Sequence, residues 1–463
     1  MTVQTEERRS QFAPQVRVYG ALETMLERKP PDFLDRLTAP AWHRRRAFIS
    51  LTRQLMKNFY CCLLLATVFP TCSEAIEIAT GKMLGKGHDA RSFYVKSGGG
   101  PWAKTYAETK YRAEAAGRLM NVRVAQGLFH DEWLTEQPFD PDQHTARLIA
   151  ALDAYREHGI LAISVSLQGA NMEYGRSGLV KRQRDYKLGP GKGALVSAFR
   201  PDGSLKEAWM KRLLHLQREL DRRGMMLDLI YYYARQDDVL TDPAAVDQGV
   251  RNVTDWLIAN NCRNVIIEIA NEHDVGSFDH GRYIHEKMGW LIELARSRFK
   301  EKDAPFVLPI SASTSTGKNF PVFAGVREHA DLAMIHGNNK TPEFKRERIA
   351  ELVADAAVPG PIYMNEDNNG RETTPNNLAR ELASCDAVFQ AGGSWGYMPW
   401  VQLQVYPFRH FMPSPVMEVM ESDPPERRDP AYFHAVLEHI RKLVETPRAA
   451  GQPCALARQG RNP

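Results

Sequence analysis

The sequence predicts an α/β protein built as one (β/α)8 barrel, the TIM-barrel fold. Two observations support this: eight short apolar segments recur between Leu119 and Gln402, and amphipathic segments with apolar residues three and four positions apart lie between them. The alternative is a doubly wound α/β fold with an open sheet. Open sheets more often stop at five or six strands, and no glycine-rich phosphate loop follows the first apolar segment, so the barrel is favoured.

The eight apolar segments are the predicted barrel strands. They begin near residues 119, 160, 225, 264, 306, 332, 361 and 392, with the sequences LMNVRVAQG, ILAISVSLQG, MMLDLIYYYA, NVIIEIANE, FVLPISAS, LAMIHGN, PIYMNED and GGSWGYMPWVQ. Helices are expected between them, among others over residues 144–159 and 205–224. These two segments end in Gly159 and Gly224, directly before the next strand, and glycine is the expected residue just beyond a helix C-terminus.

The composition is that of a soluble globular protein, with 43% hydrophobic and 25% charged residues. A net charge of +4 over 463 residues is too small to indicate a nucleic-acid partner. The six cysteines do not form a disulfide framework, because Cys61, Cys62 and Cys72 crowd into one segment and the other three are isolated, without metal-like spacing.

Residues 56–75, MKNFYCCLLLATVFPTCSEA, have the order of a secretory signal peptide: a lysine, an apolar run and a small-residue ending from Ser73 to Ala75. The apolar run is too short to span a membrane. The alternatives are a buried helix, or a twin-arginine export motif built on Arg45 and Arg46. The expected location is therefore periplasmic or secreted, with no membrane association after cleavage.

Other segments flank the predicted barrel, which occupies residues 119–448. Residues 1–55 are arginine-rich and lack sustained periodicity, which predicts a disordered extension or a mis-assigned start. Residues 76–118 are expected to form a lead-in segment with short strands, and residues 449–463 a C-terminal tail.

Polar residues follow the predicted strands, at the barrel end where catalytic groups lie in this fold. The fourth and seventh strands finish with the same Asn-Glu pair. A carboxylate at the end of an apolar strand is partly desolvated, and a fold usually accepts that cost for function or for a buried ion pair. The predicted site residues are Arg123, Gln168, Tyr233, Asn271, Glu272, His336, Asn365, Glu366 and Trp400.

Two glutamates on facing strands can hydrolyse a glycosidic bond with retention of configuration. One acts as acid and then as base on the glycosidic oxygen, the other acts as nucleophile, and the two carboxyl groups stand about 5 to 5.5 Å apart. Strands four and seven of a barrel both direct side chains inward, so their terminal residues can meet near its axis.

The motif IEIANE, residues 267–272, resembles the fourth-strand motif of clan A glycoside hydrolases. The motif PIYMNE, residues 361–366, resembles the seventh-strand motif of the same clan. This resemblance implies that Glu272 is the acid/base, that Glu366 is the nucleophile, and that Asn271 is the hydrogen-bonding partner of the sugar 2-hydroxyl.

Three further residues extend the resemblance over the whole predicted barrel. His336 is similar to the sixth-strand histidine of cellulase-like members, Trp400 to a sugar-stacking tryptophan after the eighth strand, and Arg123 to an early-strand arginine that pairs with the nucleophile. Three positions depart from the family pattern: His273 replaces a proline, Asn338 replaces a tyrosine, and the third strand ends in YYYARQ without a histidine.

The sequence thus predicts an exported retaining glycoside hydrolase that acts on a poly- or oligosaccharide without a metal or cofactor. One alternative, favoured by the departures, is a carbohydrate-binding barrel without activity; another is a metal-dependent lyase or isomerase. The candidate metal ligands have a spacing that matches no familiar site: His273, Asp274, His280 and His285. Aromatic residues that could stack on sugars are expected in the mouth loops: Trp102, Tyr106, Trp133, Tyr174 and Tyr186.

Overall fold

The computed structural model describes residues 75–107, 111, 117–124, 140–169, 196–234, 236–317, 319–369, 373–399 and 430–445. All of them belong to one compact unit, Ser73–Pro463. The predictions for residues 1–55, for residues 449–463 and for Trp400 lie outside the described residues, as does the signal-peptide prediction except at Ala75. Within the described ranges, no helix is long and apolar enough to cross a membrane.

A parallel sheet forms the centre of this unit. Its strands are hydrogen-bonded in the order β8-β7-β6-β5-β4-β12-β11-β10-β9. The two ends of this order, β8 (Ile310–Ser311) and β9 (Ser313–Thr314), are halves of one strand interrupted at Ala312. The sheet therefore closes on itself as an eight-stranded barrel, which confirms the predicted fold.

Each of the eight predicted strand segments contains a barrel strand. Besides the divided fifth strand, these are β4 (Met120–Arg123), β5 (Ala162–Ser166), β6 (Met226–Tyr232), β7 (Val265–Ala270), β10 (Ala333–His336), β11 (Ile362–Asp367) and β12 (Ser394–Tyr397). All of their residues are buried, because one face fills the barrel and the other packs against helices.

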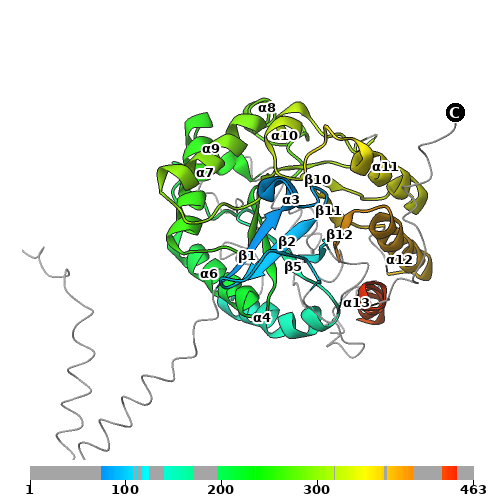
Figure 1. Cartoon of the computed structure of the whole chain (residues 1–463). Coiled ribbons are helices and arrows are strands. Elements are labelled where there is room, and N and C mark those ends of the chain that lie inside the picture. The colour runs from blue at the N-terminus through cyan, green and yellow to red at the C-terminus, as the bar shows by residue number, and fades with distance from the viewer. Residues whose placement is uncertain are drawn as a thin grey trace, which may run out of the picture. The chain divides into compact units, whose positions relative to one another are not determined.

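Helices surround the strands, as Figure 1 shows. They are α4 (Pro141–Glu157), α6 (Glu207–Arg222), α7 (Pro243–Ala259), α8 (Gly281–Glu286), α9 (Met288–Glu301), α10 (Ala324–His329), α11 (Pro342–Ala354), α12 (Pro375–Gln390) and α13 (Pro430–Glu445). Four of them begin with proline directly after a capping Asp or Thr whose side chain accepts a backbone N–H: Asp140, Asp242, Thr341 and Thr374. Proline at this position loses no helical hydrogen bond, so the sequence itself sets these starting points.

The predicted glycine stops are confirmed at Gly159 and Gly224, whose φ angles are +80° and +69°. After Gly159, the Ile160 N–H donates to the Tyr155 carbonyl at 3.1 Å, which satisfies a carbonyl that the end of α4 leaves without a helical partner. A side chain at Gly159 would also collide with Val444 of α13. Glycine is therefore required here both by the backbone turn and by helix packing.

A small antiparallel sheet covers the N-terminal end of the barrel. It consists of β1 (Ile76–Thr80), β2 (Phe93–Ser97) and β3 (Ala103–Lys104), with α3 (Gly81–Leu84) after β1. The Ile78 N–H donates to the Arg263 carbonyl just before β7, and the Arg91 guanidinium donates to the Val358 and Gly360 carbonyls just before β11. In Figure 1 this sheet lies across the barrel end that faces the viewer.

Two of the aromatic residues that were expected in the mouth loops lie instead near this small sheet. Trp102 lies beside the small sheet, with the Lys96 ammonium 4.9 Å from its ring centroid. Tyr106 is buried, and its hydroxyl donates to the Gly159 carbonyl before β5. Both residues belong to the end of the barrel opposite the strand C-termini, because the lead-in segment packs there. Trp133, Tyr174 and Tyr186 lie outside the described residues.

A buried ion pair links β11 to helix α11. The Lys345 ammonium on α11 lies 2.8 Å from both carboxylate oxygens of Asp367 and 2.9 Å from Ser384 Oγ of α12. The Trp395 indole N–H of β12 donates to Asp367 at 2.8 Å. Lys345 and Asp367 are fully buried, so each depends on the other for charge compensation.

We expect Lys345→Met to lower the free energy of unfolding by about 3–5 kcal/mol, because it leaves a buried carboxylate without its cation. Denaturant unfolding at pH 7 measures the change. The matched control is the double variant Lys345→Met/Asp367→Asn, which removes both charges and should recover part of the loss. A double variant that is no more stable than the single variant would contradict this account.

Candidate active site

Four charged side chains from four strands converge at the C-terminal end of the barrel. Arg123 ends β4, Glu272 follows β7, His336 ends β10, and Glu366 lies near the end of β11. The Arg123 Nε atom is 2.7 Å from Glu366 Oε2. The His336 Nδ1 atom is 2.9 Å from Glu272 Oε1 and 3.5 Å from Glu366 Oε1. His336 therefore lies between the two glutamates.

A strand irregularity directs Glu366 into the site. In a regular strand, consecutive side chains point to opposite faces. The register of β11 shifts at Glu366 against β10, and again between Met364 and Asp367 against β12. Asn365 and Glu366 consequently both contact groups inside the barrel, whereas Asp367 points outward to Lys345. Such an irregularity is a common means of re-aiming a side chain next to an active site.

The surroundings of Glu366 keep its carboxylate ionised. Burial alone would raise the pKa of this group, but the positive charges of His336 and Arg123 and a hydrogen bond from Asn338 together hold the pKa below its usual value. The Asn338 Nδ2 group donates to Glu366 Oε1 at 2.7 Å. Glu366 is only 5% exposed, so it is a desolvated anion that is stabilised by one hydrogen bond, from Asn338, and by the positive charges of Arg123 and His336.

Glu272 differs from Glu366 in exposure and in backbone conformation. Its side chain is 26% exposed, and its φ angle is +48°. A residue other than glycine in this left-handed region costs on the order of 1 kcal/mol or more. The Glu272 N–H donates to Ser313 Oγ at 2.9 Å, and the His273 N–H donates to the Ser313 carbonyl, which stabilises the turn. This strained backbone conformation directs the Glu272 side chain towards His336.

The two glutamates are close together. One oxygen of Glu272, Nδ1 or Nε2 of His336 and one oxygen of Glu366 all lie within 4.8 Å of one another. An approach of at most 4.8 Å between one oxygen of each glutamate fits the roughly 5–5.5 Å between the carboxyl groups of retaining glycosidases, and it is shorter than the roughly 6.5–9.5 Å that inverting enzymes need to admit a water molecule.

The other predicted site residues fall into two groups. Asn271 lies in the site, where its amide oxygen accepts a hydrogen bond from the Arg123 guanidinium. Tyr233 is 9% exposed and lies close enough to Arg123 to interact electrostatically with its guanidinium group. Gln168 and Asn365, in contrast, have their side-chain amides in contacts with other buried groups of the protein. Trp400 lies outside the described residues.

The side chains of Gln168 and Asn365 are held by other buried groups of the protein. The Gln168 side chain donates to Ser197 and to the Gln236 carbonyl, and accepts the Tyr233 N–H at 2.8 Å. The Asn365 Nδ2 group donates to Glu268 at 2.7 Å and to Asp228 at 3.1 Å. Both side chains are fully buried. The structure therefore gives these two residues a structural role, in place of the substrate contact that was expected.

Asp228 and Glu268 form an acidic layer beneath Glu272 and Glu366. This layer was not predicted from the sequence. They project into the barrel from the middle of β6 and β7 and are fully buried. Burial, and then the charge of Asp228, raises the pKa of Glu268 to about 7, and burial also raises the pKa of Asp228. An acidic residue in the middle of each of these two apolar strands was the signal that could have revealed this layer.

The raised pKa of Glu268 predicts a pH-dependent stability. Because the folded state binds this proton more tightly than the unfolded state, the stabilising contribution is complete below pH 4.5 and is lost as the pH rises through about 7. The change corresponds to up to about 3 kcal/mol. We expect Glu268→Gln to show a smaller loss of stability between pH 4.5 and 8 than the wild type, in urea unfolding at both pH values. Glu351→Gln, on an exposed part of α11, is the control; equal pH slopes in all three proteins would contradict the prediction.

No family model and no curated protein matches the sequence. Among solved structures, the chain is similar to an exo-β-1,4-mannosidase from Opitutaceae bacterium strain TAV5, with 13% identity, a TM-score of 0.43, and coverage of 73% of this chain and 62% of that one. It is also similar to a GH5_18 protein from Streptomyces cattleya in complex with GlcNAc, with 14% identity, a TM-score of 0.42, and coverage of 73% and 83%.

A GH113 β-1,4-mannanase is similar at 12% identity and a TM-score of 0.42, with 72% of this chain and 98% of that chain covered. The side chains at the strand ends of this chain determine which reaction the site can support.

The site has one set of groups that could hold a metal ion: Glu272, His336 and Glu366. Two positive charges already compensate these carboxylates. The Arg123 guanidinium is paired with Glu366, and the charges of Glu366 and Glu272 overcome the effect of burial and raise the pKa of His336, which favours its protonated form. A divalent cation would be repelled by both groups, so the arrangement favours proton-transfer chemistry over a metal-dependent lyase or isomerase.

The four metal ligands considered from the sequence do not converge as a set. His273 and His285 stack on each other, with their Nδ1 atoms 3.2 Å apart. Asp274 accepts hydrogen bonds from the backbone and hydroxyl of Ser315, and the His280 Nε2 atom lies 3.0 Å from the Leu240 carbonyl. These contacts explain the four residues as structural parts of helix α8 and of the loop that joins β7 to it.

Proposed function

We propose that this protein is a retaining glycoside hydrolase of the clan A type, with Glu366 as nucleophile and Glu272 as acid/base. One observation carries the proposal: an ionised, buried Glu366 and a partly exposed Glu272 present oxygens within 4.8 Å of each other. Two carboxylates at this separation, in two different environments, are what double displacement requires. The substrate is a poly- or oligosaccharide.

In the first step, a Glu366 oxygen attacks the anomeric carbon while Glu272 donates its proton to the departing glycosidic oxygen. In the second step, Glu272 takes a proton from a water molecule, whose oxygen attacks the same carbon and releases Glu366. Arg123 holds the Glu366 carboxylate and the Asn271 amide oxygen, so the Asn271 NH₂ group is the part left to bind the sugar 2-hydroxyl.

Asn338 supports activity in spite of its departure from the family pattern. Its side chain donates to Glu366 at 2.7 Å, so the site retains a neutral hydrogen-bond donor to the nucleophile. This contact argues against the alternative of an inactive carbohydrate-binding barrel.

The charge of His336 predicts how the activity depends on pH. Because His336 is the strongest influence that lowers the pKa of Glu366, His336→Gln should raise that pKa. The acidic limb of kcat/KM reports ionisation of the nucleophile in the free enzyme, so it should move to higher pH in the variant. Rate measurements between pH 3 and 8 test this; an acidic limb at the wild-type position would contradict it.

The experiment that tests the proposed function is a screen of the purified chain against a panel of glycans and aryl α- and β-glycosides. Glu272→Gln and Glu366→Gln are screened in parallel, so that activity from a contaminant is recognised. Hydrolysis by the wild type that both variants reduce supports the proposal. Binding of a glycan by all three proteins, with turnover of none, would favour the non-catalytic alternative.

We further propose that the protein is exported, on the basis of the residues of segment 56–75 alone. N-terminal sequencing of the protein from its native host tests this. A first residue near position 76 is expected, and a cytoplasmic chain that begins at residue 1 would contradict it.

A further inference from the structure

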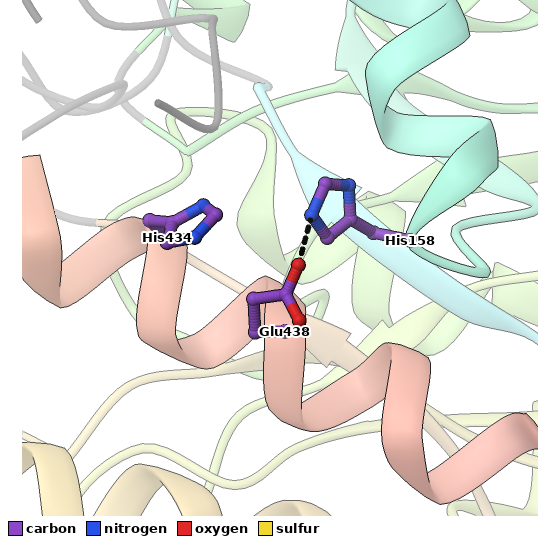
Figure 2. Close-up of side chains that lie close together, drawn as sticks. All are labelled: His158, His434 and Glu438. Atoms are coloured by element: carbon purple, nitrogen blue, oxygen red, sulfur yellow. Dashed lines mark hydrogen bonds and ion pairs between the residues drawn. The ribbon is translucent and has the colours of Figure 1, made fainter. Parts of the chain in front are cut away.

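Two histidines and a glutamate meet on the protein away from the candidate active site. His158 directly follows the last residue of α4 and lies at the N-terminal side of β5, whereas the active site lies at the C-terminal ends of the strands. His434 and Glu438 both belong to α13. They are four positions apart, so they lie on one face of this helix. Figure 2 shows the three side chains facing one another between the two helices.

The donor atoms are close enough to share one ion. His158 Nε2 is 3.0 Å from Glu438 Oε1, and a ligand atom from each of the three residues lies within 4.8 Å of the other two. The two imidazole centroids are 5.9 Å apart, with the rings nearly perpendicular. Ligands held about 2 Å from a tetrahedral zinc ion are about 3.3 Å apart, so small side-chain rotations would complete the coordination.

Neighbouring groups orient two of the three ligands. The His158 Nδ1 atom is 2.6 Å from the Ala154 carbonyl, which can only accept, so Nδ1 carries a proton and Nε2 is the ring nitrogen that faces Glu438. A bound metal ion would take the place of the proton that Nε2 shares with Glu438. The Arg441 Nη2 group donates to Glu438 Oε2 at 2.6 Å and leaves Oε1 facing the histidines. Such supporting hydrogen bonds are characteristic of metal ligands.

We propose that His158, His434 and Glu438 bind a divalent transition-metal ion, with zinc as the occupant. Two imidazoles and one carboxylate are a ligand set that zinc accepts, and the half-buried position leaves space for water as a fourth ligand. The ion links α13 to the end of α4, across 276 sequence positions from His158 to His434. It reinforces an interface that already contains the contact of Tyr155 with Phe433. The role of the ion is to fasten α13 to the barrel.

Zinc titration of the purified full chain, after treatment with a chelator, tests this proposal. Competition against a chromophoric zinc indicator gives the affinity, and thermal unfolding with and without zinc gives the effect on stability. We expect one zinc ion per chain at this site and a melting temperature that rises with zinc. His158→Ala and His434→Ala should each weaken binding at least tenfold and remove the rise, and Glu438→Gln should weaken binding while keeping the Arg441 contact.

Two control variants make the outcome decisive. His439→Ala removes a histidine of the same helix that pairs with Asp386 at 2.8 Å, and it should bind zinc like the wild type. Glu366→Gln changes the group of metal-capable residues in the active site, and it should also keep the site, which separates this proposal from the proposed function. Wild-type affinity in His434→Ala and in Glu438→Gln, or a melting temperature that zinc does not raise in the wild type, would overturn the proposal.

Discussion

Glu366→Gln should reduce turnover of every substrate by about 10⁴-fold or more, because no covalent glycosyl-enzyme can form without the carboxylate. The rate should be equally low for aryl glycosides with good leaving groups, since the missing bond is the one to the anomeric carbon. Steady-state kinetics measures the effect, below the melting temperature of the variant. Glu351→Gln makes the same chemical change on the exposed side of α11 and should keep wild-type rates.

A second variant at this position identifies the role of Glu366. Glu366→Ala leaves space beside the anomeric carbon, and azide can enter it and displace the leaving group directly. The glycosyl azide should therefore have the opposite anomeric configuration to the substrate. An azide product with retained configuration, or wild-type turnover in Glu366→Gln, would assign the nucleophile to another residue.

Glu272→Gln should separate the two chemical steps. Substrates with poor leaving groups need protonation and should lose about 10²–10⁴-fold in rate, whereas an activated aryl glycoside should still form the covalent intermediate at close to the normal rate. A burst of released phenol followed by slow turnover is the expected time course. Azide should then restore turnover, because it attacks the intermediate without needing a general base.

The azide product of Glu272→Gln should have the configuration of the substrate, opposite to that from Glu366→Ala. This pair of results distinguishes acid/base from nucleophile by product structure rather than by rate. Equal losses on activated and unactivated substrates, with no response to azide, would contradict the assignment of Glu272.

The barrel could be predicted from the sequence because its strands are short, mostly apolar and separated by amphipathic helices. The pair Asn271–Glu272 could also be predicted as part of the site, because an apolar strand segment ends there in polar residues. The division of the fifth strand at Ala312 could not be foreseen, because FVLPISAS reads as one continuous run. The position of the lead-in segment was equally hidden, since it depends on backbone hydrogen bonds to residues distant in sequence.

The parts of the site that were missed depend on three-dimensional contacts. Asn338 looks like a simple departure in the sequence, and its donation to Glu366 follows only from the pairing of β10 with β11. Glu268 looks like an interruption of an apolar strand, although it belongs to the acidic layer that Asn365 bridges. Gln168 follows its strand as a substrate-binding residue would, and yet buried neighbours occupy its amide. Sequence position identifies the end of a strand, but not whether a side chain there faces solvent or the protein.

Trapping of the covalent intermediate tests the central claim most directly. The wild type is incubated with 2,4-dinitrophenyl 2-deoxy-2-fluoro glycosides corresponding to the sugar found in the screen, and the labelled protein is digested and sequenced by mass spectrometry. We expect one fluorosugar per chain, attached to the peptide that contains Glu366, and no label in Glu366→Gln. A label on Glu272 or on any other residue, or no label on an enzyme that hydrolyses the parent aryl glycoside, would contradict it.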